Sequence, residues 1–229
     1  MKATIKFTIF NHSIKLSGAA INSWFIVMVI SIFIILVSRK IKKVKAGETP
    51  GTLVSIMEFF VEKVEDLVRN TMGDNGVHFA PYIATLLIFL VFANLLGLLG
   101  LETPTSNYSV TLALAMITFV MIHFSGIRSA GVKKYLKGFA KPTAVMLPIN
   151  LISEIATPIS MSFRLFGNML SGTVIIALIF SVLNSISIIT VPIIGPFINL
   201  YFDVFVGLVQ TFIFSMLTMV FISNKMNIN

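Results

Sequence analysis

The longest apolar segment of the chain, residues 143 to 183, sets the strongest limit on its fold. Its 41 residues hold only two ionic side chains, Glu154 and Arg164, and they include Pro148 and Pro158. A straight helix of that length would measure about 60 Å, roughly twice the hydrocarbon thickness of a bilayer. Because lipid offers no partners for backbone hydrogen bonds, we expect a membrane helix that is steeply tilted or kinked at its prolines.

The composition agrees with a membrane protein. Of the 229 residues, 56% are hydrophobic and 11% are charged, and the mean hydropathy is +0.96. Soluble domains carry roughly 25% charged residues, and a transmembrane β-barrel would show alternation of period two, which is absent. The sequence therefore predicts an all-α polytopic membrane protein with about five crossing helices and one amphipathic surface helix.

The hydropathy pattern divides one membrane domain, residues 1–229, into successive segments. Residues 53–71 place apolar side chains at i, i+3, i+4 spacing and charged ones elsewhere, which predicts an amphipathic helix on the cytoplasmic membrane surface. The other predicted segments are an external N-terminal segment (1–20), a first span (21–38), a helix pair (79–101 and 110–126), and a tilted hairpin (143–183 and 197–223) with a loop at 184–196.

Two basic clusters, "RKIKKVK" at 39–45 and "IRSAGVKKYLKGFAK" at 127–141, predict the orientation. Positive loops stay on the cytoplasmic side, so we expect the N-terminus outside and the C-terminus in the cytoplasm. Most of the net charge of +8 lies in these loops, so we expect no nucleic-acid partner. The Lys-rich loops and the Ile-, Asn- and Lys-heavy composition favour a bacterial plasma membrane over the mitochondrial inner membrane.

The sequence offers no metal or cofactor site. It has no Cys, and its three His, at positions 12, 78 and 123, are scattered. It also has no GxxxxGK[ST] phosphate-binding sequence, so we expect no phosphoryl chemistry and no catalytic site of its own.

Three ionic side chains, Glu154, Arg164 and Asp203, lie deep within the last two predicted spans, whereas Lys225 lies in the tail and is expected to reach water. An ionisable group at mid-membrane costs at least about 2.5 to 3.5 kcal/mol, so it indicates a function unless an ion pair within the chain explains it. Ten residues, or about 15 Å of helix, separate Glu154 from Arg164, so the two do not pair locally. Arg164 is thus expected to act on a group outside this chain.

Polar residues accompany these charges on the same helix faces. Asn168 lies one turn after Arg164, and Gln210 lies on the side of the last helix that carries Asp203. A guanidinium is a fixed charge that favours the ionised form of a nearby carboxylate, whereas carboxyl groups can bind and release protons. The pattern indicates an ion pathway with a cationic barrier in its middle.

Three stretches resemble subunit a of the rotary F-type ATP synthase. They are "PINLISEIATPISMSFRLFGNMLSG" at 148–172, "LVQTFIFSMLTMVFIS" at 208–223 and "FLVFANLLGLLGLETPTSNYSVTLALA" at 89–115. The resemblance covers nearly the whole chain after its first 20 or so residues. It implies a stator subunit with two offset half-channels, whose partners are a ring of c subunits, the b subunits of the peripheral stalk and the remainder of the complex.

The resemblance also implies roles for individual residues. Arg164 matches the arginine that faces the c-ring, and Asn168 and Gln210 match polar residues near it. Glu154 and Asp203 match positions of the half-channel open to the outside. In two further positions, Asn94 matches an Asn of the third membrane segment, and Thr173 stands where some members carry Glu.

Two alternatives remain open. A stand-alone secondary transporter or channel would use Arg164 for an anionic substrate or an internal pair with Asp203, although no inverted repeat is visible. A structural scaffold would use an Arg–acid pair only to hold helices together.

Overall fold

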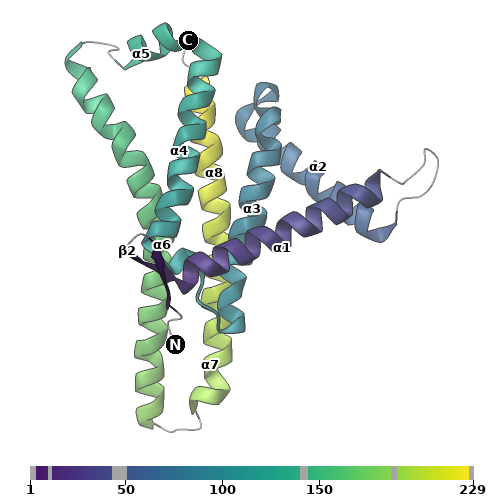
Figure 1. The fold of residues 1–229 in the computed structure, drawn as a ribbon, viewed down its shortest axis with the longest axis vertical. Coiled ribbons are helices and arrows are strands. Elements are labelled where there is room, and N and C mark those ends of the chain that lie inside the picture. The colour runs from purple at the N-terminus through teal and green to yellow at the C-terminus, as the bar shows by residue number, and fades with distance from the viewer. Residues whose placement is uncertain (1–3, 10–11, 43–50, 140–143, 187–189, 227–229) are drawn as a thin grey trace.

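The computed structural model describes residues 4–9, 12–42, 51–139, 144–186 and 190–226 (Figure 1). Parts of the predicted basic loops, residues 43–45 and 140–141, lie outside the described residues, as does residue 143 at the predicted start of the long span.

The described chain consists almost entirely of helices, and five stretches are long and apolar enough to cross a membrane. The all-α polytopic fold predicted from the sequence is confirmed. The elements are β1 (Thr4–Ile9), β2 (His12–Ser17), α1 (Gly18–Ile41), α2 (Thr52–Met72), η1 (Asp74–Phe79), α3 (Ala80–Leu95), η2 (Leu96–Leu99), η3 (Pro104–Ser106), α4 (Tyr108–Ala130), α5 (Val132–Gly138), η4 (Ala144–Met146), α6 (Leu147–Ile186), α7 (Thr190–Leu200), η5 (Tyr201–Val206) and α8 (Gly207–Met226).

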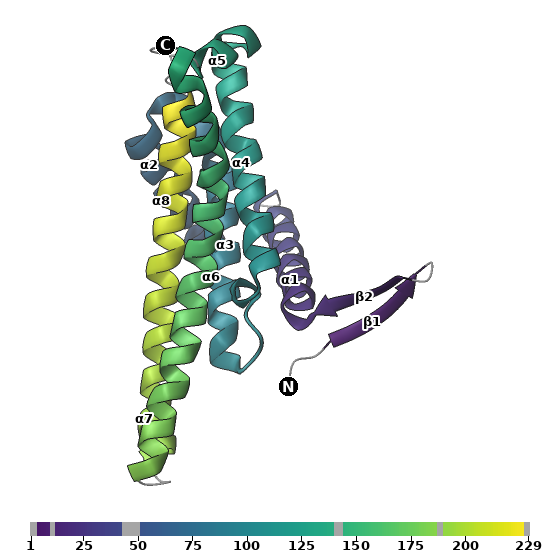
Figure 2. The same cartoon turned by 90° about the vertical axis from the view of Figure 1, so that its left-hand side faces the viewer.

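The N-terminal segment contains a β-hairpin that the sequence analysis did not anticipate. Strands β1 and β2 pair antiparallel, from Thr4 opposite Ser17 to Ile9 opposite His12. Figure 2 shows the hairpin projecting away from the helices. Helix α1 starts directly after it, where the Ser17 hydroxyl accepts a hydrogen bond from the Ala19 amide at 3.3 Å. The hairpin is an addition to a helical membrane fold and leaves that fold class unchanged.

Helix α2 is amphipathic, because its charged and apolar side chains occupy different faces. Val64 and Val68 are buried and pack with Met219 and Ile222 of α8. On the solvated side Lys63 and Asp66 form an exposed ion pair at 3.5 Å. The helix ends at Gly73, whose φ of +76° is accessible to glycine without strain.

The core of the bundle is formed by α3, α4, α6 and α8 (Figures 1 and 2). The buried side chains Leu90, Leu165 and Phe214 meet in one apolar cluster. Helix α1 runs obliquely across this bundle (Figure 1). The long helix α6 continues through Pro158, and Figure 1 shows that it changes direction along its length.

The predicted loop at 184–196 is wrong for residues 184–186 and 190–196, which are helical, and residues 187–189 lie outside the described residues. Helix α6 runs to Ile186, and α7 begins at Thr190 and continues through Pro196 into η5 and α8. Pro192 stands in the first turn of α7, where its missing amide hydrogen is not needed. Residues 190–196 therefore belong to the start of the final helical stretch.

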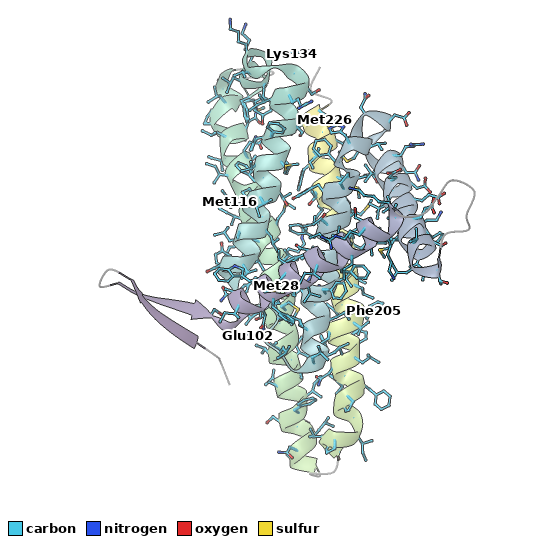
Figure 3. All side chains as sticks on the ribbon, turned by 45° about the vertical axis from the view of Figure 1, so that its right-hand side comes forward. Met28, Glu102, Met116, Lys134, Phe205 and Met226 are labelled. Carbon is cyan, nitrogen blue, oxygen red and sulfur yellow. The ribbon has the colours of Figure 1, made fainter. Side chains whose placement is uncertain are left out.

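The two ends of the bundle are distinct. The end of α8 lies beside α5 at one end, and α7 lies at the other (Figures 1 and 2). The Ser129 hydroxyl, just before α5, donates a hydrogen bond to the Met226 carbonyl at 2.8 Å. In Figure 3, Lys134 and Met226 mark the first end, and Phe205 projects from the bundle nearer the other.

Candidate ion pathway

Helices α6 and α8 meet through a polar contact near the middle of the bundle. The Asn168 amide nitrogen donates a hydrogen bond to the Gln210 side-chain oxygen. Gln210 is buried, whereas Asn168 is exposed. The Gln210 amide nitrogen is also buried and has no hydrogen-bond partner in the described part of the chain. The structure thus brings together two of the residues that the sequence analysis selected.

Arg164 lies one helical turn before Asn168 and is partly exposed. Within the described ranges, none of the ion pairs includes Arg164. Its helix is anchored behind it, because Leu165 is fully buried and the hydroxyls of Ser162 and Thr111 hydrogen-bond at 3.2 Å. A fixed cation therefore stands on a firmly packed helix without a carboxylate partner among the described residues.

The two acids lie on opposite sides of Arg164 along the bundle axis. Glu154 precedes Arg164 by ten residues, about 15 Å of helix. In the antiparallel final helix, Asp203 precedes Gln210 by seven residues, about 10 Å toward the α7 end. Phe202, the residue before Asp203, lies 3.4 Å from the position that a Cβ on Gly172 would take. Asp203 therefore lies at the level of the part of α6 that follows Asn168, on the side away from Glu154.

Asp203 is held by close backbone packing. It lies in η5, a π-helical turn, and is half-buried. Its carboxylate atoms lie 2.9 to 3.0 Å from the position that a Cβ on Gly97 would take, so a side chain there would force the Asp203 carboxylate to shift. No ion pair within the described residues includes Asp203. Single π-helical turns are often found at functional sites.

Asn94 has its side-chain amide fully engaged. It donates to the Gly207 carbonyl at 3.0 Å and to the Thr211 hydroxyl at 3.2 Å, and it accepts from the Thr105 hydroxyl at 3.0 Å. Only 3% of its surface is exposed. A Cβ on Gly207 would lie 2.9 Å from that of Asn94, so α3 and α8 approach closely here. Asn94 therefore fixes the distance between the helices that hold Asp203 against Gly97.

Glu154 stands in a separate cluster near α5 and the C-terminus. Its carboxylate pairs with the Lys225 ammonium, and its other oxygen lies 3.7 Å from the His123 Nε2 atom. Tyr135 hydrogen-bonds the His123 Nδ1 atom. Arg164 lies between the levels of Glu154 and Asp203, so the two acids that the resemblance implied for one half-channel stand apart along the bundle axis. The expectation that Lys225 would only reach water is wrong, because it pairs with Glu154.

Residues whose role depends on pairing between helices could not be identified from the sequence alone. His123 and Lys225 join Glu154, Gly97 accommodates Asp203, and Thr105 with Thr211 engages Asn94. The contact between Asn168 and Gln210 sets the register of the antiparallel helices α6 and α8. With this register, Glu154, about fourteen residues before Asn168, lies opposite Lys225, about the same number of residues after Gln210.

The sequence model of the family described as ATP synthase A chain matches residues 20–223. The chain belongs to this family. Among its relatives, ATP synthase subunit a 1 of Crocosphaera subtropica is 32% identical over 217 residues, which cover 94% of this chain and 89% of that protein. ATP synthase subunit a 2 of a Bradyrhizobium species is 36% identical, over 91% of this chain and 88% of that protein.

A more distant relative is ATP synthase subunit a of Moorella thermoacetica, 29% identical over 92% of this chain and 91% of that protein. These relatives of the ATP synthase A chain family are bacterial, and the chain matches nearly their whole length. With its five apolar helical stretches, the chain is a multi-pass membrane protein of this bacterial type.

Proposed function

We propose that the chain is the ion-translocating stator subunit of the ATP synthase membrane sector. The observation that carries the proposal is the position of Arg164. It is a partly exposed cation that lacks a carboxylate partner in the described chain, and it lies between two acids at different levels of the bundle. Membership of the ATP synthase A chain family supports the same function.

The missing partner of Arg164 is a carboxylate of a rotating c-ring. The exposed side of α6 beside Arg164 carries Asn168 and Ser171, together with the partly exposed Gly167. Small and polar side chains allow a neighbouring helix to approach closely in a membrane. A ring carboxylate that arrives there stays ionised beside the guanidinium, and it crosses the lipid only after it has been neutralised by the coupling ion.

The two acids serve opposite half-channels. Asp203 lies on the α7 side, toward the outside, and loads the ring carboxylate. Glu154 lies on the side of the C-terminus, toward the cytoplasm, and receives the ion that leaves. Arg164 blocks direct ion passage between the two half-channels because its guanidinium stays protonated. Each charge that crosses gains about 2.3 kcal/mol per 100 mV, so several crossings are summed for one ATP.

The remaining polar residues hold together the helices that carry Arg164 and Asp203. Gln210 and Asn168 join α8 to α6 next to Arg164, and Asn94 joins α3 to α8 next to Asp203. Thr173, where some members of the family carry Glu, directly follows Gly172, which lies close to Phe202. The acid that those members carry on α6 is thus supplied at the same level by Asp203 on η5. The b subunits and the rest of the complex hold this chain still while the ring turns.

The test is the variant Arg164→Ala in the whole complex. We expect the complex to assemble with its c-ring and to lose ATP synthesis driven by proton or sodium-ion gradients, supplied separately. Lys137→Ala removes an exposed cation from α5 and is the control, with synthesis unchanged. Normal coupled synthesis in Arg164→Ala would overturn the proposal. Ion transport by the purified chain alone at the rate of the whole complex would instead support a stand-alone transporter.

A further inference from the structure

The cluster around Glu154 joins four helices at one end of the bundle. His123 comes from α4, Tyr135 from α5, Glu154 from α6 and Lys225 from α8. The side chains of Glu154 and Lys225 are only 18% and 20% exposed. These are the titratable and charged groups that face Glu154 among the described residues.

The ammonium of Lys225 has a second favourable environment besides the carboxylate. Its Nζ atom lies 5.1 Å from the ring centroid of Phe139 and 5.8 Å from that of Tyr135. Aromatic faces attract cations at these distances. The lysine stem is long and flexible, so the ammonium can shift between the carboxylate and the rings with small movements.

Tyr135 is held as a neutral hydroxyl. Burial, and then the charge of Glu154, raises the pKa of Tyr135 to about 12. Its hydroxyl can therefore donate to the His123 Nδ1 atom, which leaves the proton of neutral His123 on Nε2. The Nε2 atom is buried without a hydrogen bond in the described structure, and it faces Glu154 at 3.7 Å. A small rotation would let it donate to the carboxylate when Lys225 moves away.

A cavity of about 230 Å³ lies against this ion pair. It has room for several water molecules and is lined by polar groups that can bind them. The lining residues are Tyr135, Gly138, Phe139, Asn150, Ser153, Glu154 and Lys225. The Glu154 carboxylate thus opens onto a cavity that water can enter.

We propose that Lys225 is a tethered cation that occupies the Glu154 carboxylate, and that the coupling ion must displace it to pass. The inference rests on the proposed function and adds a regulating residue to the cytoplasmic half-channel. An ammonium and a second cation repel each other on one carboxylate, so ion passage requires Lys225 to move toward Phe139 and Tyr135. Lys225 thus slows ion passage at this end while it closes the cavity at rest.

The test measures ATP synthesis by the assembled complex in membrane vesicles at a limiting ion gradient, where ion passage sets the rate. Rates are normalised to the amount of this chain that copurifies with the c-ring. We expect Lys225→Gln to raise the rate by about two- to fivefold, the range for loss of one partly screened charge contact. In the Glu154→Gln background the same change has no effect, because the carboxylate that Lys225 occupies is absent.

Lys137→Gln on α5 is the matched control, because this exposed cation lies at the same end and outside the cluster. The inference is overturned if Lys225→Gln leaves the normalised rate unchanged or lowers it, or if its effect persists without Glu154. Loss of assembly in Lys225→Gln that is restored in Glu154→Gln/Lys225→Gln would also overturn it, in favour of a structural pair. Normal synthesis in Arg164→Ala removes the proposed function itself, independently of these outcomes.

Discussion

Asp203 and Glu154 are both carboxylates within long apolar helices, yet the structure holds them in opposite ways. Glu154 pairs with Lys225 and faces His123, at a junction of four helices. Asp203 has no ion-pair partner among the described residues and fits against Gly97, where a side chain would collide with it. The Glu154 carboxylate is stabilised by an ion pair, whereas the Asp203 carboxylate is positioned by its steric fit against Gly97.

This difference predicts different consequences for stability when either charge is removed. Loss of the Glu154 charge leaves Lys225 unpaired in a half-buried site, so it disturbs the fold. Loss of the Asp203 charge leaves no cation behind, so it should act on ion flux alone.

Asp203→Asn should have the largest effect. We expect ion flux to fall about tenfold or more, because a neutral amide cannot bind and release the coupling ion as a carboxylate does, while assembly and stability stay unchanged. Gradient-driven ATP synthesis and the amount of copurified chain measure the two effects. Flux that stays unchanged across pH would exclude Asp203 from the pathway.

Gly97→Ala should reproduce part of that effect without changing the acid itself. The new methyl group would lie 2.9 to 3.0 Å from the Asp203 carboxylate atoms and would push them aside. We expect flux to fall by about two- to tenfold, since a shift of about 1 Å is enough to weaken a positioned group. Leu98→Ala changes a 43%-exposed neighbour in the same turn and should leave flux unchanged. Equal effects of the two variants would contradict the steric explanation.

Glu154→Gln should lower the free energy of unfolding by about 1 to 3 kcal/mol, between the values for exposed and fully buried ion pairs. Thermal or denaturant unfolding of the purified chain in detergent measures this loss. The double variant Glu154→Gln/Lys225→Gln should recover part of it, because no unpaired charge remains. Asp203→Asn in the same assay should match the unaltered chain. A similar loss in both single variants would remove the contrast between the two acids.

The smallest effect concerns the titration of Tyr135. Its folded pKa is raised from an ordinary value of 10.0 to about 12, by burial and by the charge of Glu154. The stability that the neutral hydroxyl contributes is fully present below pH 10 and is lost as the pH rises from 10 to about 12. The difference in tyrosinate absorbance between the unaltered chain and Tyr135→Phe should appear near pH 12, and earlier in Glu154→Gln. An ordinary titration near pH 10 would contradict this environment.

The helices could largely be predicted from the sequence because hydrophobic length is a local property. The apolar run from 143 and the amphipathic pattern of 53–71 needed no knowledge of the neighbours. The N-terminal hairpin was missed because its strands are stabilised by pairing between β1 and β2. The sequence placed residues 190–196 in a loop, whereas they form the start of α7, where a first-turn proline such as Pro192 is compatible with a helix.

For the candidate site, the spacing of residues on single helices was sufficient to group Arg164 with Asn168, and Asp203 with Gln210. It could not show that Glu154 meets Lys225, because this contact depends on the relative register of α6 and α8. It also could not show the fit of Asp203 against Gly97, which depends on how closely α8 approaches α3.

The sequence by itself determined that this protein lies in a membrane, that a fixed cation and two acids lie within its last helices, and to which family it is similar. Only the tertiary structure decided that the acids occupy different levels on either side of Arg164, and which of them has an ionic partner. The physical reason is that hydropathy and helical periodicity act along one chain segment. Ion pairs and steric fits between helices depend instead on distances that the packing of several segments sets.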